Sequence, residues 1–376
     1  MMKIRTVFSA VWGFIHRNPV LCLAGLLAVG TAFFVPPDGQ YLAYFDFRTL
    51  TCLFCTLAVI CALQDIHFFT ILAERLVKLT GNLRMAVFTL VVITFLGSMV
   101  LANDMALLTF LPLGYTLLAS TDNKKYMAVV FILQNISANL GGMLTPFGNP
   151  QNLYLYSRFA IPTGEFMKIM FPPFLMAILL LGLCCVFFPG KPLTLRTETQ
   201  GKLIRKRSIF YLILFAFSVA IVFRLFPYWI GLIVIPVTLF FADRKALREV
   251  DYGLLLTFAF FFVFAGNLSR IEAVQTLLCG LMEQEPLLVS VLSCQVISNV
   301  PSAVLLSNFT SDYVPLLVGV NLGGTGTLIA SLASLITFRK YRKYAPGNTL
   351  KYVLTFSAFN FGFLLLLTAM EYWLLS

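Results

Sequence analysis

The sequence contains few charged residues. Only 11% of its 376 residues are Asp, Glu, Lys or Arg, whereas a soluble domain carries about 25%. A soluble fold is therefore excluded, because the chain could not cover itself with polar surface. Hydrophobic residues make up 59% of the chain, and apolar runs near the ~20 residues that cross a bilayer recur from end to end. We predict an all-α polytopic membrane protein that forms one unit in the lipid bilayer.

The chain also lacks the residue groups that enzymes and metalloproteins use. It has two His residues, and Cys52 and Cys55 are followed by no second pair or His cluster, so no metal centre is predicted. No nucleophile and base come together in an apolar run, which argues against an enzyme. We expect no cofactor other than a coupling ion, Na⁺ or H⁺.

Acidic residues are scarce, and the net charge is +11. No basic groove with stacking aromatic residues accompanies this charge, so no nucleic-acid partner is expected. Most of the 27 Lys and Arg residues instead fall in loops that alternating spans place on one side, which is the positive-inside pattern. We therefore expect an integral protein of a bacterial inner membrane, with its N-terminus in the cytoplasm and its C-terminus outside.

Two polar, Gly-rich stretches interrupt long apolar runs and resemble each other. Asn139 to Asn152 reads NLGGMLTPFGNPQN, and Asn321 to Ser334 reads NLGGTGTLIASLAS. They share the NLGG opening and a Thr at the seventh position. Non-helical backbone at membrane depth is tolerated only where it is buried in protein or lines a cavity. We interpret the two stretches as breaks in two spanning helices that face each other across a substrate site.

An apolar segment with a polar centre precedes each break. Residues 85–119 contain Asn103 and Asp104, and both ends of this segment carry cations. The segment is either a pair of full spans or a re-entrant hairpin, and we favour the hairpin because its second arm, 105–119, is short for a crossing. Residues 286–310 are interrupted around Asn299, and their arms are too short to cross twice.

These elements recur in the same order, which predicts two repeats. The first repeat covers 1–188, with its broken helix at 126–157. A cytoplasmic linker covers 189–208, and an extra span with the second repeat covers 209–376, with its broken helix at 313–338. The extra span inverts the second repeat, so the first hairpin opens inward and the second outward. Inverted repeats with discontinuous helices near the membrane midplane are typical of secondary transporters.

A broken helix leaves backbone groups unpaired and exposes the ends of its dipole. An N-terminal end attracts an anion, and unwound carbonyl groups coordinate a cation. Asp104 could hold Na⁺, exchange a proton, or cap the second arm of its hairpin. We predict a Na⁺ site near Asn103, Asp104 and Asn149. The candidate substrate- and ion-binding residues are Asn103, Asp104, Asn139, Gly142, Thr145, Gly148, Asn149, Asn152, Ser298, Asn299, Asn321, Gly324, Thr327 and Ser331.

Four motifs in order resemble the ion transporter superfamily, which includes citrate-type transporters, arsenite permeases and divalent-anion symporters. LANDMALLTFLP is similar to the first hairpin motif of the arsenite permease branch, NLGGMLTPFGNPQN to the first broken helix, SNVPSAVLLS to the second hairpin and GGTGTLIASLASL to the second broken helix. The resemblance implies a scaffold and a mobile transport domain, a homodimer, and an elevator movement. It places one half-site at Asn103 and the first break, and the other at Ser298, Asn299 and the second break.

The chain departs from the symporters at both hairpin tips. Those proteins carry a Ser-Asn-Thr triplet, where this chain has Ala102-Asn103-Asp104 and Ser298-Asn299-Val300. We predict a secondary active transporter of a small anion, a carboxylate or an inorganic oxyanion, coupled to Na⁺ or H⁺. An arsenite or antimonite efflux permease and a Na⁺/H⁺ antiporter are the alternatives. Of the two half-sites, the first, with Asp104, is expected to hold the coupling ion more tightly.

Overall fold

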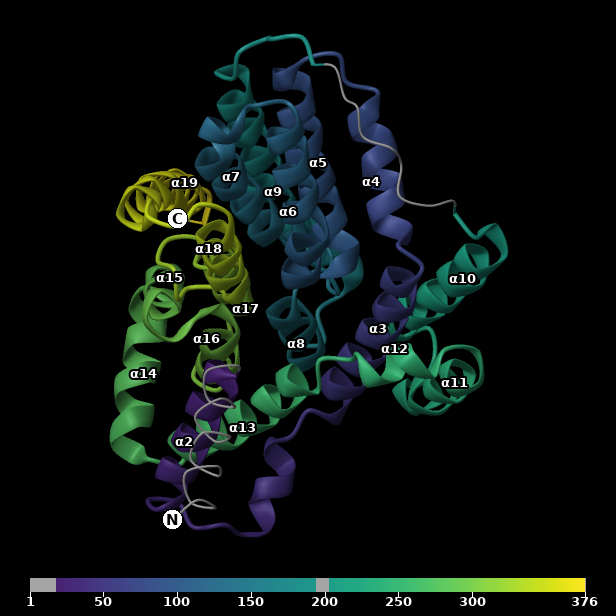
Figure 1. The fold of residues 1–376 in the computed structure, drawn as a ribbon. Coiled ribbons are helices and arrows are strands. Elements are labelled where there is room, and N and C mark those ends of the chain that lie inside the picture. Colours follow the sequence, from purple (N-terminus) through teal and green to yellow (C-terminus); the bar gives the residue numbers. More distant parts are fainter. Residues whose placement is uncertain (1–17, 194–202, 376) are drawn as a thin grey trace, which may run out of the picture.

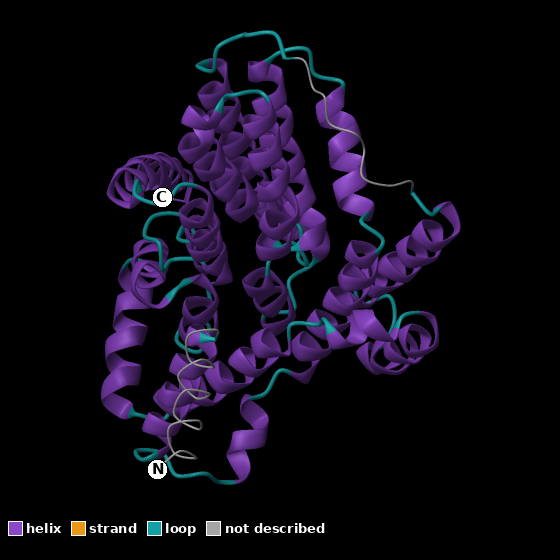
Figure 2. Cartoon of the chain, viewed as in Figure 1, coloured by secondary structure: helices purple, strands orange, loops and turns teal. Residues whose placement is uncertain are grey.

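The computed structural model describes residues 18–193 and 203–375. The N-terminal residues and the centre of the predicted linker 189–208 lie outside these ranges. Within them, all regular structure is helical apart from one isolated bridge between Asn82 and Pro192 (Figure 2). The predicted all-α fold is therefore confirmed.

The chain forms a series of long helices interrupted by short ones (Figure 1). Up to residue 193 the elements are α2 (Pro19–Ala32), η1 (Gly39–Tyr44), α3 (Phe47–Asp65), α4 (Phe68–Lys78), α5 (Leu83–Leu101), α6 (Asn103–Ser120), η2 (Lys124–Tyr126), α7 (Met127–Gly141), η3 (Gly142–Leu144), α8 (Pro150–Arg158) and α9 (Thr163–Val186). From residue 203 they are α10 (Arg205–Val222), α11 (Tyr228–Ala242), α12 (Arg244–Arg248), α13 (Tyr252–Leu268), α14 (Glu272–Gln284), α15 (Pro286–Ile297), α16 (Asn299–Leu306), α17 (Tyr313–Leu322), α18 (Leu332–Tyr344) and α19 (Thr349–Leu375).

Several of the scarce acidic residues begin helices. Asp46 accepts a hydrogen bond from the backbone N–H of Thr49 at the start of α3, and Asp251 accepts one from Leu254 at the start of α13. Asp312 does the same at α17. A side-chain oxygen at this position pairs one of the backbone donors that a helix leaves free. These acids therefore mark helix starts.

The outside of the molecule is apolar and part of its inside is polar. Phe33, Leu79 and Phe241 each expose about four-fifths of their surface, whereas Gln134 and Asn135 are fully buried. Six helices of the described part are long and apolar enough to cross a membrane, and α2, α11, α15 and α17 are shorter apolar helices. This distribution is the one that a bilayer requires, because lipid surrounds apolar side chains and interhelical contacts satisfy the polar ones.

Equivalent helices of the two halves make reciprocal contacts. Helix α2 packs against α13, and α11 packs against α3. In the same way, α18 packs against α6 and α7, while α8 packs against α16 and α17. Each half thus contributes the second part of its broken helix to the hairpin of the other half.

The first hairpin differs in one respect from the sequence-based expectation. Its second arm, predicted over 105–119, begins at Asn103 and runs to Ser120, so α6 has 18 residues. The tip residues are helical because the side chain of Asn103 accepts the N–H of Asp104. The second arm, whose shortness favoured a re-entrant hairpin over two spans, is therefore longer than predicted, and the re-entrant path stays a prediction. In the second hairpin, α15 has 12 residues and α16 has 8.

Candidate functional site

The tips of the two hairpins have the same backbone conformation. Ala102 lies at φ 60° and ψ 153°, and Ser298 lies at φ 75° and ψ 158°. Positive φ is uncommon for residues other than glycine and persists where the surrounding structure enforces it. The next residue is Asn103 or Asn299, and its side-chain oxygen accepts the backbone N–H of the residue that follows, at 2.9 Å in both cases. Both asparagines therefore begin a new helix immediately after a strained residue.

The two breaks also correspond position by position. Helix α7 ends at Gly141 and α8 begins at Pro150, while α17 ends at Leu322 and α18 begins at Leu332. The residues before the new helices, Asn149 and Ser331, are both the eleventh of their motifs and both have extended backbone. The repeated NLGG motifs thus interrupt helices at matching positions, as the sequence predicted.

The shared threonines connect each break to its own hairpin. Thr145 Oγ1 donates to the carbonyl oxygen of Met99 at 3.0 Å, and Thr327 Oγ1 donates to that of Gln295 at 3.1 Å. Met99 and Gln295 both lie three residues before the strained tip residue. The two hydroxyl groups, which the sequence suggested as ligand-binding groups, therefore hold the hairpins in place.

The two breaks are joined by buried amide side chains. Asn321 Nδ2 donates to Asn152 Oδ1 at 2.6 Å, and Asn321 Oδ1 accepts from Asn149 Nδ2 at 3.4 Å. On the other side, Asn139 Oδ1 accepts from Ser331 Oγ at 2.8 Å and from Asn103 Nδ2 at 3.2 Å. The sequence predicted that the breaks face each other, and the structure brings them into direct contact.

Replacing Asn321 with alanine should lower the stability of the protein by about 2–3 kcal/mol, because Asn152 Oδ1 would lose its buried donor. Thermal unfolding of the detergent-purified protein measures the change. The control is Gln275→Ala, which removes an exposed amide from α14. Equal unfolding temperatures for the two variants would contradict the assigned role of Asn321.

Glycines allow the chain to fold back within each break. A Cβ at Gly148 would lie 2.3 Å from the carbonyl oxygen of Gly142, and a Cβ at Gly142 would lie 2.5 Å from Asn149 Oδ1. A Cβ at Gly324 would lie 3.0 Å from the side-chain nitrogen Nδ2 of Asn299. These predicted site residues therefore shape the breaks through close backbone approach.

Four helices begin at one small cavity of about 50 Å³. They are α6, α8, α16 and α18, and the remaining wall comes from α2 and α13. The polar lining consists of Asn103, Asp104, Gln151, Thr257, Ser298, Asn299 and Ser331. The structure thus brings together predicted residues of both hairpin tips and the cap of α18, whereas Asn139, Asn149, Asn152 and Asn321 form the bonded layer beside them.

Several buried polar atoms around this cavity have no hydrogen-bond partner among the described residues. They are Asp104 Oδ1, Asn149 Oδ1, Gln151 Oε1 and Asn139 Nδ2. Three of the four are acceptors, which suits a cation or a proton-bearing group. Asp104 lies within the first turn of α6 and Ala102 is the cap residue, so the predicted capping role of Asp104 has no hydrogen bond to support it. Gln151 was missed as a site residue, although it lies within the first repeated motif.

Comparison with known proteins assigns this chain to a family. The profile of the citrate transporter family matches residues 7–313. The chain belongs to the citrate transporter family. It is 33% identical over 297 residues to an uncharacterized transporter of Methanocaldococcus jannaschii, which covers 78% of this chain and 81% of that protein. It is 30% identical over 323 residues to the inner membrane protein YbiR of Escherichia coli, covering 84% and 85%.

The third relative is a mouse protein with lower sequence identity. The chain is 26% identical over 202 residues to the P protein of Mus musculus, covering 52% of this chain and 23% of that protein. The family consists of transporters and the Methanocaldococcus jannaschii relative is named as one, so this chain is a secondary transporter and not an enzyme. It is an integral membrane protein, which its apolar helices require independently. The predicted membership of the ion transporter superfamily is confirmed.

Proposed function

We propose that the protein is a secondary active transporter of a small anion, a carboxylate or an inorganic oxyanion, and that the anion binds where α6, α8, α16 and α18 begin. The convergence of these four helix starts on one cavity carries the proposal. Each helix start is equivalent to about +0.5 elementary charge, and its free N–H groups point along the helix axis. The cavity therefore favours a negative charge, although no lysine or arginine of the described residues lines it.

Coupling to Na⁺ or H⁺ follows from the acid in the same cavity. A bound anion would be repelled by the carboxylate of Asp104 unless a cation or a proton accompanied it. The unpaired oxygens of Asp104, Asn149 and Gln151 supply acceptors for that cation. Anion and coupling ion would then bind together, which is the condition for symport. Among the described residues, Asp104 alone contributes a carboxylate to this cavity.

An inverted repeat and an elevator movement are part of the proposal. The matching tip conformations, the matching break positions and the reciprocal helix contacts support the division into repeats at 1–188 and 209–376. The hydrogen bonds between breaks and hairpins would let these elements move as one unit against α2, α3, α11 and α13. A homodimer in a bacterial inner membrane, with the N-terminus inside and the C-terminus outside, completes the proposed arrangement.

A thermal-shift screen tests this function on the purified protein. Citrate, succinate, sulfate and arsenite would each be added with and without Na⁺, and at two pH values. Citrate, succinate or sulfate should raise the unfolding temperature more when Na⁺ or protons are supplied with it, because a ligand at 100 times its Kd stabilises the native state by about 2.7 kcal/mol. Uptake of the same radiolabelled anion into proteoliposomes would then establish transport.

The second candidate is a Na⁺/H⁺ antiporter, which the excess of unpaired acceptor oxygens favours. It predicts stabilisation by Na⁺ alone, with no response to any anion. Stabilisation by arsenite alone would favour an arsenite or antimonite efflux permease. Either result would replace the proposed anion symport.

A further inference from the structure

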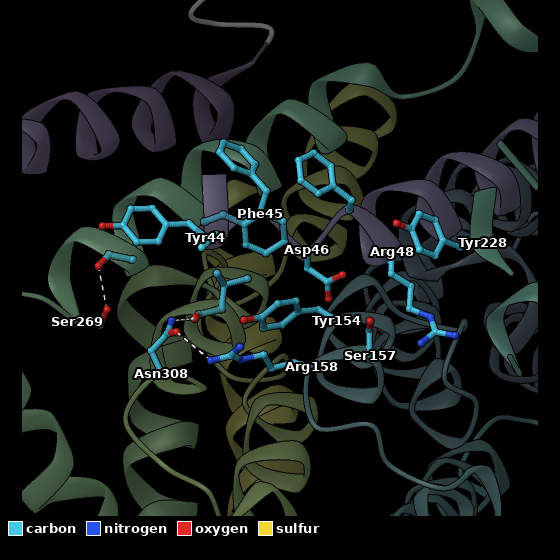
Figure 3. Close-up of a pocket in the computed structure, with 15 residues that line it drawn as sticks. Tyr44, Phe45, Asp46, Arg48, Tyr154, Ser157, Arg158, Tyr228, Ser269 and Asn308 are labelled. Atoms are coloured by element: carbon cyan, nitrogen blue, oxygen red, sulfur yellow. Dashed lines mark hydrogen bonds between the residues drawn. The ribbon is translucent and has the colours of Figure 1, made fainter. Parts of the chain in front are cut away.

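A second, larger pocket of about 550 Å³ lies at the opposite ends of three helices that line the site, α8, α13 and α16. Figure 3 shows its lining residues. It is bounded by the segment before α3, the C-terminal ends of α8, α13 and α16, and the start of α11. The proposed orientation places all of these segments outside the cytoplasm. We refer to this pocket as the outer vestibule. Its polar and charged lining residues are Tyr44, Asp46, Arg48, Tyr154, Ser157, Arg158, Tyr228, Ser269 and Asn308.

The described lining of the outer vestibule carries a net positive charge, because two arginines stand against one carboxylate. Both carboxylate oxygens of Asp46 already accept hydrogen bonds from Thr49, at 2.9 Å from its N–H and at 2.6 Å from its hydroxyl. Arg158 makes one long hydrogen bond, from Nη2 to Asn308 Oδ1 at 3.5 Å. Arg48 has no hydrogen-bond or ion-pair partner in the part of the chain that the structure describes. Two guanidinium groups therefore retain donors that a ligand can use.

These arginines come from different helices and approach the pocket from different sides. Arg48 lies in the first turn of α3, and Arg158 is the last residue of α8. In Figure 3 their guanidinium groups point toward opposite sides of the pocket, with Ser157 and Tyr154 also in its lining. Guanidinium groups match the geometry of carboxylates and oxyanions, and both sides of an extended anion could be engaged.

Three helices, α8, α13 and α16, line both the outer vestibule and the small cavity at the four helix starts, which we call the inner cavity. On α8, Gln151 lines the inner cavity and Tyr154, one turn later, lines the vestibule. Tyr154 is the vestibule residue of α8 nearest to Gln151 in the chain, and it makes an aromatic contact: its ring lies 5.5 Å from that of Phe262, and its hydroxyl is 2.8 Å from Ser307 Oγ. Arg158 lies about two helical turns beyond Gln151 on α8, so an anion at Arg158 would be about two turns from the inner site.

We propose that the outer vestibule is an anion-binding site in its own right, where Arg48 and Arg158 hold a small carboxylate or oxyanion before it passes the Tyr154–Phe262 contact to the inner cavity. This proposal rests on the proposed function, because passage from the vestibule to the inner cavity assumes that the protein transports an anion. A site of this kind raises the local concentration of anions at the mouth of the transporter and binds them without taking part in the coupled step.

Thiol labelling tests the charge of the vestibule without any knowledge of the substrate. Ser157→Cys would place a thiol in the lining, and its rates of reaction with an anionic and a cationic methanethiosulfonate would be compared. The anionic reagent should react faster, and Arg48→Gln or Arg158→Gln should each lower the ratio of the two rates about threefold. Lys168→Gln removes an exposed cation outside the vestibule and should leave the ratio unchanged. A ratio unaffected by either arginine substitution would overturn the proposal.

Transport kinetics provide the second test, with citrate and sulfate as probes. Arg158→Gln should raise KM about three- to tenfold and change kcat less than twofold, because the lost contact precedes the coupled step. Arg158→Lys should restore part of the affinity, and Lys168→Gln should match the wild type. If Arg158→Gln and Arg158→Lys both keep the wild-type KM, the vestibule site is overturned while anion transport stays intact. The proposed function would instead be contradicted if the wild type took up neither citrate nor sulfate while the anionic reagent still labelled Ser157→Cys faster than the cationic reagent.

Discussion

Replacing Asp104 with asparagine is expected to reduce ion-driven anion uptake at least tenfold. The substitution keeps the size of the side chain and removes the only carboxylate that the described part of the chain places in the inner cavity. Without that charge, the cavity no longer requires a cation or proton to accompany the anion, and the coupling that drives accumulation is lost. Uptake into proteoliposomes would be measured with and without a Na⁺ or pH gradient. The gradient should accelerate the wild type and leave the variant unaffected.

The chain supplies a matched control for this prediction. Glu371 on α19 is 2% exposed, and its Oε1 has no partner among the described residues, yet it lies outside the cavity lining. Glu371→Gln makes the same chemical change at a second buried acid and should alter gradient-driven uptake less than twofold. Retained coupling in Asp104→Asn together with lost coupling in Glu371→Gln would transfer the coupling role from the cavity to α19.

Replacing Gly141 with alanine is expected to destabilise the protein by about 3 kcal/mol and to abolish uptake. Gly141 is the last residue of α7, and a Cβ there would lie 2.1 Å from the carbonyl oxygen of Phe95 and 2.6 Å from Ser98 Oγ on α5. The backbone of α5 cannot rotate away as a side chain would, so α7 must separate from the first hairpin. Thermal unfolding and proteoliposome uptake measure the two effects.

Gly362 provides the comparison for Gly141. It lies within α19, and a Cβ there would meet no atom within 4 Å. Gly362→Ala should therefore leave uptake unchanged and raise helix stability by up to about 1 kcal/mol, because alanine favours the helix more than glycine does. If Gly141→Ala unfolds at the same temperature as Gly362→Ala, the close approach of α7 and α5 is not required for the native fold.

The sequence determined the elements of this protein and the places where they are interrupted. Low charge and recurring apolar runs require a membrane protein, because such a chain cannot cover itself with polar surface. The paired NLGG motifs predicted two broken helices, and α7 and α17 end within them. Asn103 and Asn299 were predicted at hairpin tips, where both begin a helix. These features are local, since glycine, proline and polar residues act on the backbone near them.

Only the tertiary structure decided which of the predicted residues line the inner cavity. Thr145 and Thr327 bond to hairpin carbonyls, whereas Gln151 lines the cavity without having been predicted. The contact between Asn321 and Asn152 joins residues 169 positions apart, and Arg48 and Arg158 share a pocket although distant segments carry them. Composition and periodicity tell how each helix is buried, but the rotation of one helix against another depends on side-chain packing across the whole fold. That packing fixed both the cavity at the helix starts and the charged vestibule beyond it.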